Sequence, residues 1–320
     1  MAALSDFPSR IRVEDLRRVR NEDLEPVLDE EVAAWRDELA WDFTSSAELV
    51  RRFVGIQSLS GFAIYDGPAC AGYGYYVAED RKGLIGDLYV RRAYRTVENE
   101  NLLLGAMVES LLRMPQVSRI ESQLMMLESP LARPLPMQHR VRVFHRHFME
   151  ARLQPSLALR ERELPGIRIQ PWEDRRQEDS AQVIADAYQG HVDALINDQY
   201  RTAAGARRFL MNIVQYPGCG SFFAEASLAA YWLETQKMAG LCLASLVARQ
   251  TGHITQVCVS RDAKGRGAGY ELMRRSLDRM RQHGCDRVSL TVTASNRDAV
   301  RLYENIGFRV RRNFAAYVWE

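Results

Sequence analysis

The sequence has few cysteines, little net charge and no long apolar run. Its five cysteines show no pair at the short spacing of a metal site, so we predict a reduced protein without a metal. The net charge of only +2 argues against binding to nucleic acid or to a membrane surface. The longest useful apolar stretch, Gly240 to Ala248, is far shorter than the roughly 20 residues that span a bilayer.

Two further scarcities bear on localisation and on ligands. Residues 1–20 contain no apolar run of the secretory kind, and we therefore expect the protein to be cytoplasmic. Among the 43 basic residues, only Lys82, Lys237 and Lys264 are lysines. Codon bias explains that imbalance most simply. The alternative is that arginine side chains serve phosphate recognition, for which the guanidinium group is well shaped.

The length and an internal repeat indicate two similar domains. A chain of 320 residues suits two domains, and the polar segment Glu161–Gly166 with its Pro-Gly turn lies near the midpoint. We therefore predict domains at residues 1–160 and 161–320. Three elements recur in the same order at an offset of 168–169 residues, which favours an internal duplication over chance. They are a strand (85–90 and 254–259), a helix (98–113 and 267–282) and a second strand (119–125 and 287–292). Each half reads as a mixed α/β domain with a partly antiparallel sheet.

A glycine-rich turn in the second half is the most informative segment. An apolar strand ends near Val259, and a turn with Gly265, Gly267 and Gly269 leads into an amphipathic helix. Free N–H groups at a helix start attract anions, and glycines let a phosphate approach the backbone. Neither a Rossmann motif, which would need glycine in place of Tyr270 or Leu272, nor a Walker A motif fits this turn. The alternative is a turn that only connects strand and helix.

Two motifs together resemble the GNAT superfamily of N-acetyltransferases. The run Lys264-Gly-Arg-Gly-Ala-Gly269 resembles that family's coenzyme A motif, Q/R-x-x-G-x-G/A, with lysine replacing the first residue. Downstream, Asn296 to Phe308 matches the family pattern N-x-x-A-x-x-L-Y-x-x-x-G-F at every named position. Asn296 also suits a helix N-cap, and Gly307 a helix end.

The resemblance implies two GNAT-like acyl-CoA N-acyltransferase domains, each a mostly antiparallel sheet flanked by helices. Acetyl-CoA would be the co-substrate, without a metal, and the acceptor would be an amine of a small molecule or a peptide. Tyr303 occupies the family's usual position for the acid that protonates the leaving thiolate. The remaining implied residues would contact the cofactor: Val257, Cys258, Val259, Lys264, Gly265, Arg266, Gly267, Ala268, Gly269 and Asn296. From strand alternation, we expect the Cys258 side chain to be buried rather than nucleophilic.

The general base is less clearly indicated. His253 lies six residues before Val259, where many relatives have a catalytic glutamate, and a histidine that titrates near neutrality could do the same work. The alternative is a solvent-facing histidine at a strand start. Glu225 and Glu234 are looser candidates.

The first copy lacks both motifs. Glu98 and Glu100 stand where the second copy has Gly267 and Gly269, which places two negative charges at the phosphate position. The tyrosine is also missing, since Leu135, or Phe144 after a nine-residue insertion, takes its place. We predict that residues 1–160 are degenerate and non-catalytic, and that the two domains act as a pseudo-dimer within a monomer.

Two other functions compete with acetyl transfer. One is a regulatory module that binds acetyl-CoA without turnover. The other is a different acyl or aminoacyl transferase on the same fold, although the balanced charge does not favour binding to tRNA.

Overall fold

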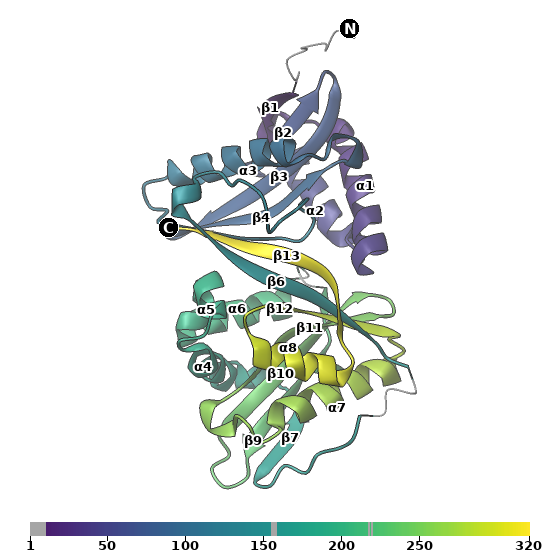
Figure 1. The fold of residues 1–320 in the computed structure, drawn as a ribbon, viewed down its shortest axis with the longest axis vertical. Coiled ribbons are helices and arrows are strands. Elements are labelled where there is room, and N and C mark those ends of the chain that lie inside the picture. The colour runs from purple at the N-terminus through teal and green to yellow at the C-terminus, as the bar shows by residue number, and fades with distance from the viewer. Residues whose placement is uncertain (1–10, 155–158, 217, 219) are drawn as a thin grey trace. The chain divides into compact units, whose positions relative to one another are not determined.

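The computed structural model describes residues 11–154, 159–216, 218 and 220–320 (Figure 1). It divides into two compact units that interleave along the chain. Unit 1 takes the chain as far as Glu38, then Phe43–Phe144 and Phe314–Glu320. Unit 2 takes Leu39–Asp42 and His145–Asn313. These units do not coincide with the predicted domains, residues 1–160 and 161–320. Leu39–Asp42 and the segment that begins at His145 belong to unit 2, and Phe314–Glu320 belongs to unit 1.

Unit 1 is a mostly antiparallel sheet with helices. The sheet order is β1-β2-β3-β4-β5-β13, in which only β4 and β5 run parallel. Helix α3 packs against β2, β3 and β4. The elements are β1 (Ile11–Asp15), α1 (Asn21–Leu39), α2 (Thr44–Gly55), β2 (Gly61–Asp66), β3 (Ala69–Glu79), β4 (Lys82–Val90), α3 (Val97–Leu112), β5 (Arg119–Leu124) and β13 (Arg309–Trp319).

Unit 2 repeats this plan. Its sheet order is β7-β9-β10-β11-β12-β6, and again one pair, β11 and β12, is parallel. Helices α7 and α8 share one core with the sheet, while α4 and α6 share a second. The elements are β6 (Val141–Arg152), β7 (Ile167–Pro171), α4 (Gln177–Tyr188), α5 (Asp193–Ile196), α6 (Ala203–Gln215), β8 (Ser221–Phe222), β9 (Leu228–Trp232), β10 (Met238–Ala248), β11 (Thr251–Val259), α7 (Ala268–His283), β12 (Arg287–Thr293) and α8 (Arg297–Ile306).

The repeat extends to strand register. In unit 1 the parallel pairing runs from Lys82 opposite Arg119 to Ile85 opposite Ser122. In unit 2 it runs from Thr251 opposite Arg287 to Ile254 opposite Leu290, which is the same register at the offset of the sequence repeat. A β-bulge also recurs at equivalent places, between Tyr75 and Tyr76 and between Leu243 and Ala244. Each of the three predicted elements is present in both units, with ends shifted by a few residues at most.

The two halves of the sequence exchange strands. β13 comes from the second half, yet Ala315–Trp319 pairs with β5 in unit 1. β6 comes from the first half, yet Arg146–Arg152 pairs with β12 in unit 2. The short segment Leu39–Asp42 also joins unit 2, where the Asp42 N–H donates to the Val247 carbonyl at 2.8 Å. Neither sheet is therefore built from one half alone.

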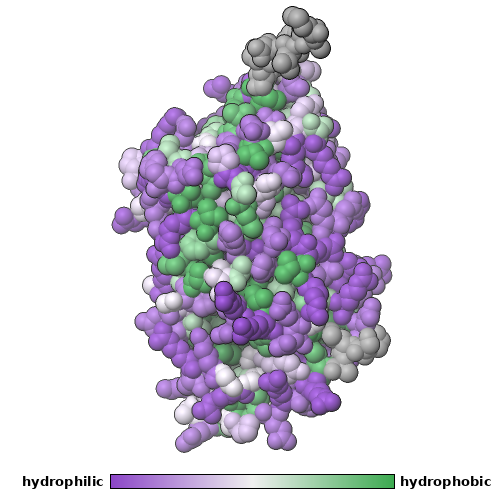
Figure 2. All heavy atoms as spheres, in the orientation of Figure 1, coloured by the Kyte–Doolittle hydropathy of each residue, from purple (hydrophilic) through white to green (hydrophobic). Residues whose placement is uncertain are grey.

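The face of the molecule in Figure 2 is mostly polar, and the described cysteines are buried. Hydrophilic residues predominate on the face shown in Figure 2, and hydrophobic residues form small groups among them. Across the described part of the chain, no helix has both the length and the apolar character needed to cross a bilayer. Cys70, Cys242, Cys258 and Cys285 are free and buried, and Cys219 lies outside the described residues.

A pair of buried carboxyl groups lies inside unit 1. Glu31 on α1 accepts hydrogen bonds from the Tyr73 hydroxyl at 2.8 Å and from the Trp35 indole at 3.3 Å. Asp87 on β4 accepts from the backbone N–H of Leu88 at 2.8 Å. Burial raises the pKa of Asp87 to about 6, and burial together with the Asp87 charge raises the pKa of Glu31 well above its usual value. The folded protein therefore holds protons at this pair more tightly than the unfolded chain does.

We expect this pair to stabilise unit 1 more in mild acid than in alkali. The contribution of the pair to the free energy of unfolding is lost as pH rises from about 4, the pKa of a carboxyl group in the unfolded chain, through its higher pKa in the folded protein. We expect Asp87→Asn, which keeps the acceptor for Leu88, to shrink the fall in free energy of unfolding between pH 5 and pH 8 by about 2 kcal/mol. Denaturant unfolding at pH 5 and at pH 8 measures this change in the free energy of unfolding. Asp66→Asn, at an exposed position, is the control. If the free energy of unfolding of Asp87→Asn depended on pH as it does in the wild type, the raised pKa values of this pair would be contradicted.

Candidate functional site

The parallel strands of unit 2 part halfway along their length. Pairing between β11 and β12 ends at Ile254 and Leu290. Beyond that point, β11 stays paired on its other side with β10, as far as Val259 opposite Gly240. The edge of β11 that faces β12 is therefore without ladder partners near Val257 and Val259. Open backbone groups of this kind can accept an extended ligand as though it were a strand.

The glycine-rich turn leads from this open edge into α7. Gly265 and Gly267 have φ angles of +75° and +84°, a conformation that favours glycine, and a Cβ at Gly265 would meet only open space. Gly267 is the N-cap of α7, and no side chain caps the helix there. The first N–H groups of α7 are thus left for another partner, in the geometry that suits an anion. Lys264 and Arg266 are exposed beside them.

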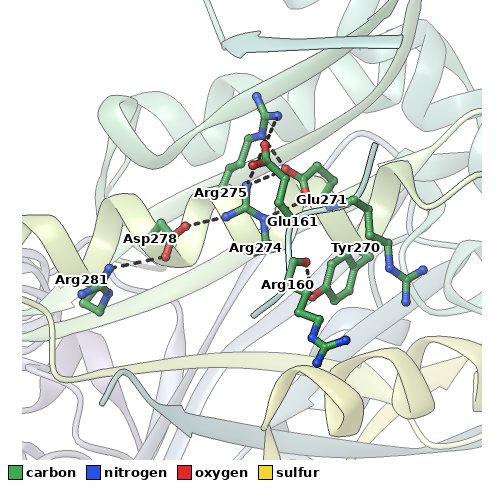
Figure 3. A network of polar contacts seen from close by, with 9 residues as sticks. Arg160, Glu161, Tyr270, Glu271, Arg274, Arg275, Asp278 and Arg281 are labelled. Atoms are coloured by element: carbon green, nitrogen blue, oxygen red, sulfur yellow. Dashed lines mark hydrogen bonds and ion pairs between the residues drawn. The ribbon is translucent and has the colours of Figure 1, made fainter. Parts of the chain in front are cut away.

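The linker between the sequence halves packs against the start of α7 (Figure 3). The Tyr270 hydroxyl donates to the Arg160 carbonyl at 2.9 Å, and the Glu161 carboxylate pairs with Arg275 at 3.3 Å. The Arg162 guanidinium lies 4.4 Å from the centre of the Tyr270 ring. A Cβ on Gly267 would lie 3.9 Å from Arg162 Nη1, so this cation adjoins the turn. Nothing in the local sequence around Arg162 predicts that it lies beside the glycine-rich turn.

Buried glutamate Glu271 fixes this arrangement. It lies one turn into α7 and pairs with Arg274 and Arg275, both at 2.7 Å. Its carboxylate also accepts the backbone N–H of Arg162 at 3.3 Å. Arg274 continues the network to Asp278 at 2.8 Å, as Figure 3 shows. Arg274 and Arg275 of α7 are therefore paired with carboxylates, whereas the Arg162 guanidinium makes no ion pair in the described part of the chain.

Helix α8 places the second motif beside the open edge. The Asn296 side chain caps α8 by accepting the Ala299 N–H at 3.3 Å, and Gly307 ends the helix with a φ of +108°, as predicted. Tyr303 is 7% exposed and belongs to the core against which Val257 and Val259 pack. Burial, together with buried thiols and a carboxylate nearby, raises the pKa of Tyr303, so its hydroxyl stays protonated at neutral pH.

The surroundings of His253 do not favour a basic role. Its Nδ1 lies 2.9 Å from the Ser289 hydroxyl, and the Trp41 ring packs edge-on against it at 4.9 Å. Burial lowers the pKa of His253 to about 3, so the ring is neutral and holds a proton weakly at pH 7. It is also not solvent-facing, the alternative stated above, because Trp41 from the first half covers it. Glu225 and Glu234 are exposed.

Cys258 behaves as its alternation predicts. It belongs to the core that packs under α4 and α6, while Val257 and Val259 pack on the side of α7. Burial raises the pKa of the Cys258 thiol to about 12, which leaves it protonated and poorly nucleophilic.

A polar cluster missed by sequence analysis surrounds the end of β12. Asp193 accepts a hydrogen bond from the Thr293 hydroxyl and lies 3.8 Å from Arg146. His191 lies 3.6 Å from Asp193 and 3.2 Å from the Asn296 side chain. The only signal in the sequence was the pairing of His191 with Asp193 in one loop, and their partners come from distant segments. Among the described residues, no group of three or more His, Cys, Asp or Glu is placed to hold a metal ion.

The equivalent turn of unit 1 is filled by its own side chains. Thr96 caps α3 by accepting the Asn99 N–H at 3.2 Å. Glu100 forms an ion pair with Arg133 at 2.5 Å, in which both side chains are at most 1% exposed. The Glu100 carboxylate also accepts the Glu128 N–H at 3.0 Å. Phe144 lies on strand β6, so the helix that would carry a counterpart of Tyr303 is absent from the described residues of unit 1.

Comparisons with known proteins agree with this geometry. The profile of the acetyltransferase (GNAT) family matches residues 191–308. A mycothiol acetyltransferase from Corynebacterium jeikeium is 34% identical over 68 residues, 21% of this chain and 20% of that protein. The N-alpha-acetyltransferase MAK3 of Arabidopsis thaliana is 34% identical over 87 residues, 25% of this chain and 46% of that protein. The chain thus matches less than half of the length of these curated relatives.

Solved structures show the same fold over nearly the whole chain. A GCN5-related N-acetyltransferase from Sphaerobacter thermophilus has a TM-score of 0.70 at 18% identity, covering 98% of this chain and 96% of that one. A tandem GNAT protein from the clavulanic acid biosynthesis pathway has a TM-score of 0.59 at 15% identity, covering 96% and 98%. The chain has the mixed α/β fold of these proteins. Residues 191–308 are the part that matches the acetyltransferase (GNAT) family.

Proposed function

We propose that unit 2 transfers an acetyl group from acetyl-CoA directly to an amine of a small molecule or a peptide. The observation that carries this proposal is the open edge of β11 beside the uncapped start of α7, with Tyr303 packed in the same core. The family of residues 191–308 supports it. The relatives are named mycothiol acetyltransferase and N-alpha-acetyltransferase, so their names do not select one acceptor class.

The residues of the turn and of β11 fit acetyl-CoA. The N–H groups of Gly267, Ala268 and Gly269 would bind the pyrophosphate, and Lys264, Arg266 and Arg162 would add positive charge. The open backbone of Val257, Cys258 and Val259 would hold the pantetheine chain. Gly265 lets the turn adopt its left-handed conformation, and Asn296 holds the start of α8 beside the strand.

Transfer needs an acid for the leaving thiolate, and Tyr303 suits that role. Its raised pKa keeps the hydroxyl protonated, so that it can donate a proton to the sulfur of the leaving thiolate. His253 has no part in this proposal, because its ring is buried and its pKa is too low for it to take a proton from an ammonium group.

Unit 1 would not catalyse transfer. Thr96 already accepts an N–H of the first turn of α3, and Glu100, which stands where unit 2 has Gly269, is buried in an ion pair with Arg133. A second anion there would have to displace a buried ion pair, which is costly. Unit 1 is on this proposal the degenerate copy.

Calorimetry should show that each chain binds a single acetyl-CoA. Gly267→Glu should weaken binding at least about 100-fold, or about 2.7 kcal/mol, because it adds a negative charge and a side chain at a left-handed φ. Gly284→Glu is the matched control, since Gly284 has a φ of +102° in open space at the other end of α7. Two equivalent sites per chain would refute the account of unit 1.

Arg162 should contribute through the phosphates alone. We expect Arg162→Gln to weaken coenzyme A binding about fivefold at low salt, the range of an exposed charge contact. The KM for S-acetylpantetheine, which lacks the pyrophosphate, should not change. Arg160→Gln is the control, because Arg160 contacts α7 through its backbone carbonyl. An equal loss with acetyl-CoA and with S-acetylpantetheine would show that Arg162 does not contact the phosphates.

Tyr303→Phe separates an enzyme from a binding module. The variant should bind acetyl-CoA normally and lose about 100-fold or more in kcat, because the thiolate then leaves without its acid. Thiol release in the presence of a panel of amines measures this. Normal binding by the wild-type protein without turnover on any amine would favour the regulatory module instead.

A further inference from the structure

Two glycines at the start of α7 point to opposite sides. A Cβ on Gly269 would lie 3.7 Å from a side-chain carbon of Val259, at the end of β11. A Cβ on Gly267 would instead lie 3.6 Å from side-chain carbons of Arg162 and Leu164, in the linker. Residues two positions apart on a helix face nearly opposite directions, since each residue turns the helix by about 100°. The start of α7 is therefore flanked by β11 on one side and by the linker on the other.

The Arg162 side chain is held on the linker side without a carboxylate partner among the described residues. Its guanidinium lies 4.4 Å from the centre of the Tyr270 ring, and its Nη1 would lie 3.9 Å from a Cβ on Gly267. A guanidinium that stacks on a ring keeps its in-plane N–H groups for an oxyanion. The positive end of the α7 dipole repels a cation, so an arginine fixed beside it indicates a place for an anion.

Glu271 holds the linker backbone from which this side chain extends. Its carboxylate is buried and accepts the Arg162 N–H at 3.3 Å. The Tyr270 hydroxyl donates to the Arg160 carbonyl at 2.9 Å, so two peptide groups of the linker are fixed on α7 (Figure 3). At the equivalent position of unit 1, Leu102 is 42% exposed. The plan that the two units share therefore needs no buried carboxylate here, which leaves the linker as the reason for Glu271.

We propose that Arg162, positioned by Glu271, binds the 3′-phosphate of coenzyme A and makes the protein select donors that carry this group; this rests on the proposed binding of acetyl-CoA. In that binding mode the pantetheine chain lies along β11 and the pyrophosphate at the first N–H groups of α7. The nucleotide end then continues past the turn to the side away from β11, where Arg162 lies. The 3′-phosphate is on the ribose of that end, and its oxygens suit the paired donors of a guanidinium.

Coenzyme A and 3′-dephospho-coenzyme A, which differ only in the 3′-phosphate, test this assignment. Calorimetry gives a Kd for each ligand, and the ratio of the two Kd values isolates the 3′-phosphate, because general damage to the site weakens both ligands alike. We expect the wild-type protein to prefer coenzyme A about fivefold at low salt, and Arg162→Gln to remove that preference. Arg266→Gln is the matched variant from the turn itself. It should weaken the binding of both ligands and leave the ratio unchanged.

Glu271→Leu tests the positioning role by the sign of its effect. Removing a negative charge near a phosphate site should, by Coulomb attraction alone, strengthen binding. If Glu271 acts by holding Arg162, the variant should instead lose most of the preference for coenzyme A. The double variant with Arg162→Gln should then lose no more of that preference than Arg162→Gln alone. Asp278→Leu is the control and should keep the wild-type ratio, because Asp278 pairs with Arg274 and Arg281 rather than with the linker.

If Glu271→Leu does not fold, Tyr270→Phe replaces it, since it removes only the hydroxyl that binds the linker and should lower the ratio in the same direction. A wild-type ratio near one, an unchanged ratio in Arg162→Gln, or an equal change in Arg266→Gln overturns the assignment of the 3′-phosphate and leaves the proposed transfer standing. An unchanged ratio in the folded linker variant, or an equal loss in Asp278→Leu, overturns the positioning role. Failure of the wild-type protein to bind coenzyme A overturns this proposal and the proposed function together.

Discussion

The parting of two parallel strands is the constraint on which the rest of unit 2 depends. β11 and β12 pair for four residues and then separate, so that β11 ends with an open edge beside the start of α7. A paired strand has no free backbone groups to offer a ligand, and an isolated strand would have no fixed position. Here β10 holds β11 in place from the other side, which keeps the open edge rigid. The turn, Tyr303 and the cluster at His191 all take their positions from this edge.

Unit 1 has the same parting, in the same register, but its turn is filled by side chains and its described residues include no counterpart of α8. β4 and β5 separate after Ile85 and Ser122, as their counterparts do. The two units thus share a backbone plan, while in unit 1 Thr96 caps the turn and Arg133 is buried against Glu100. A shared scaffold does not imply shared chemistry.

The sequence predicted what depends on local patterns and missed what depends on distant ones. The turn, the α8 cap and the strand–helix–strand repeat each follow from residues close together in the chain, and the structure has all three. The burial of His253 was not predicted, because Trp41, which packs against it, lies more than 200 positions earlier. The contacts of Arg162 and the partners of His191 were missed for the same reason. Residue spacing carries no record of which segments meet in the folded chain.

The exchange of strands makes unit 2 depend on the first half of the sequence. β6, from the first half of the sequence, lies beside β12 and supplies Arg146 next to Asp193. Leu39–Asp42, also from the first half, packs Trp41 against the base of β11. Removing the first half would therefore leave β12 with an unpaired edge and Asp193 without its cation. Whatever unit 1 binds, the first half of the sequence is needed for β6 and Trp41, which belong to unit 2.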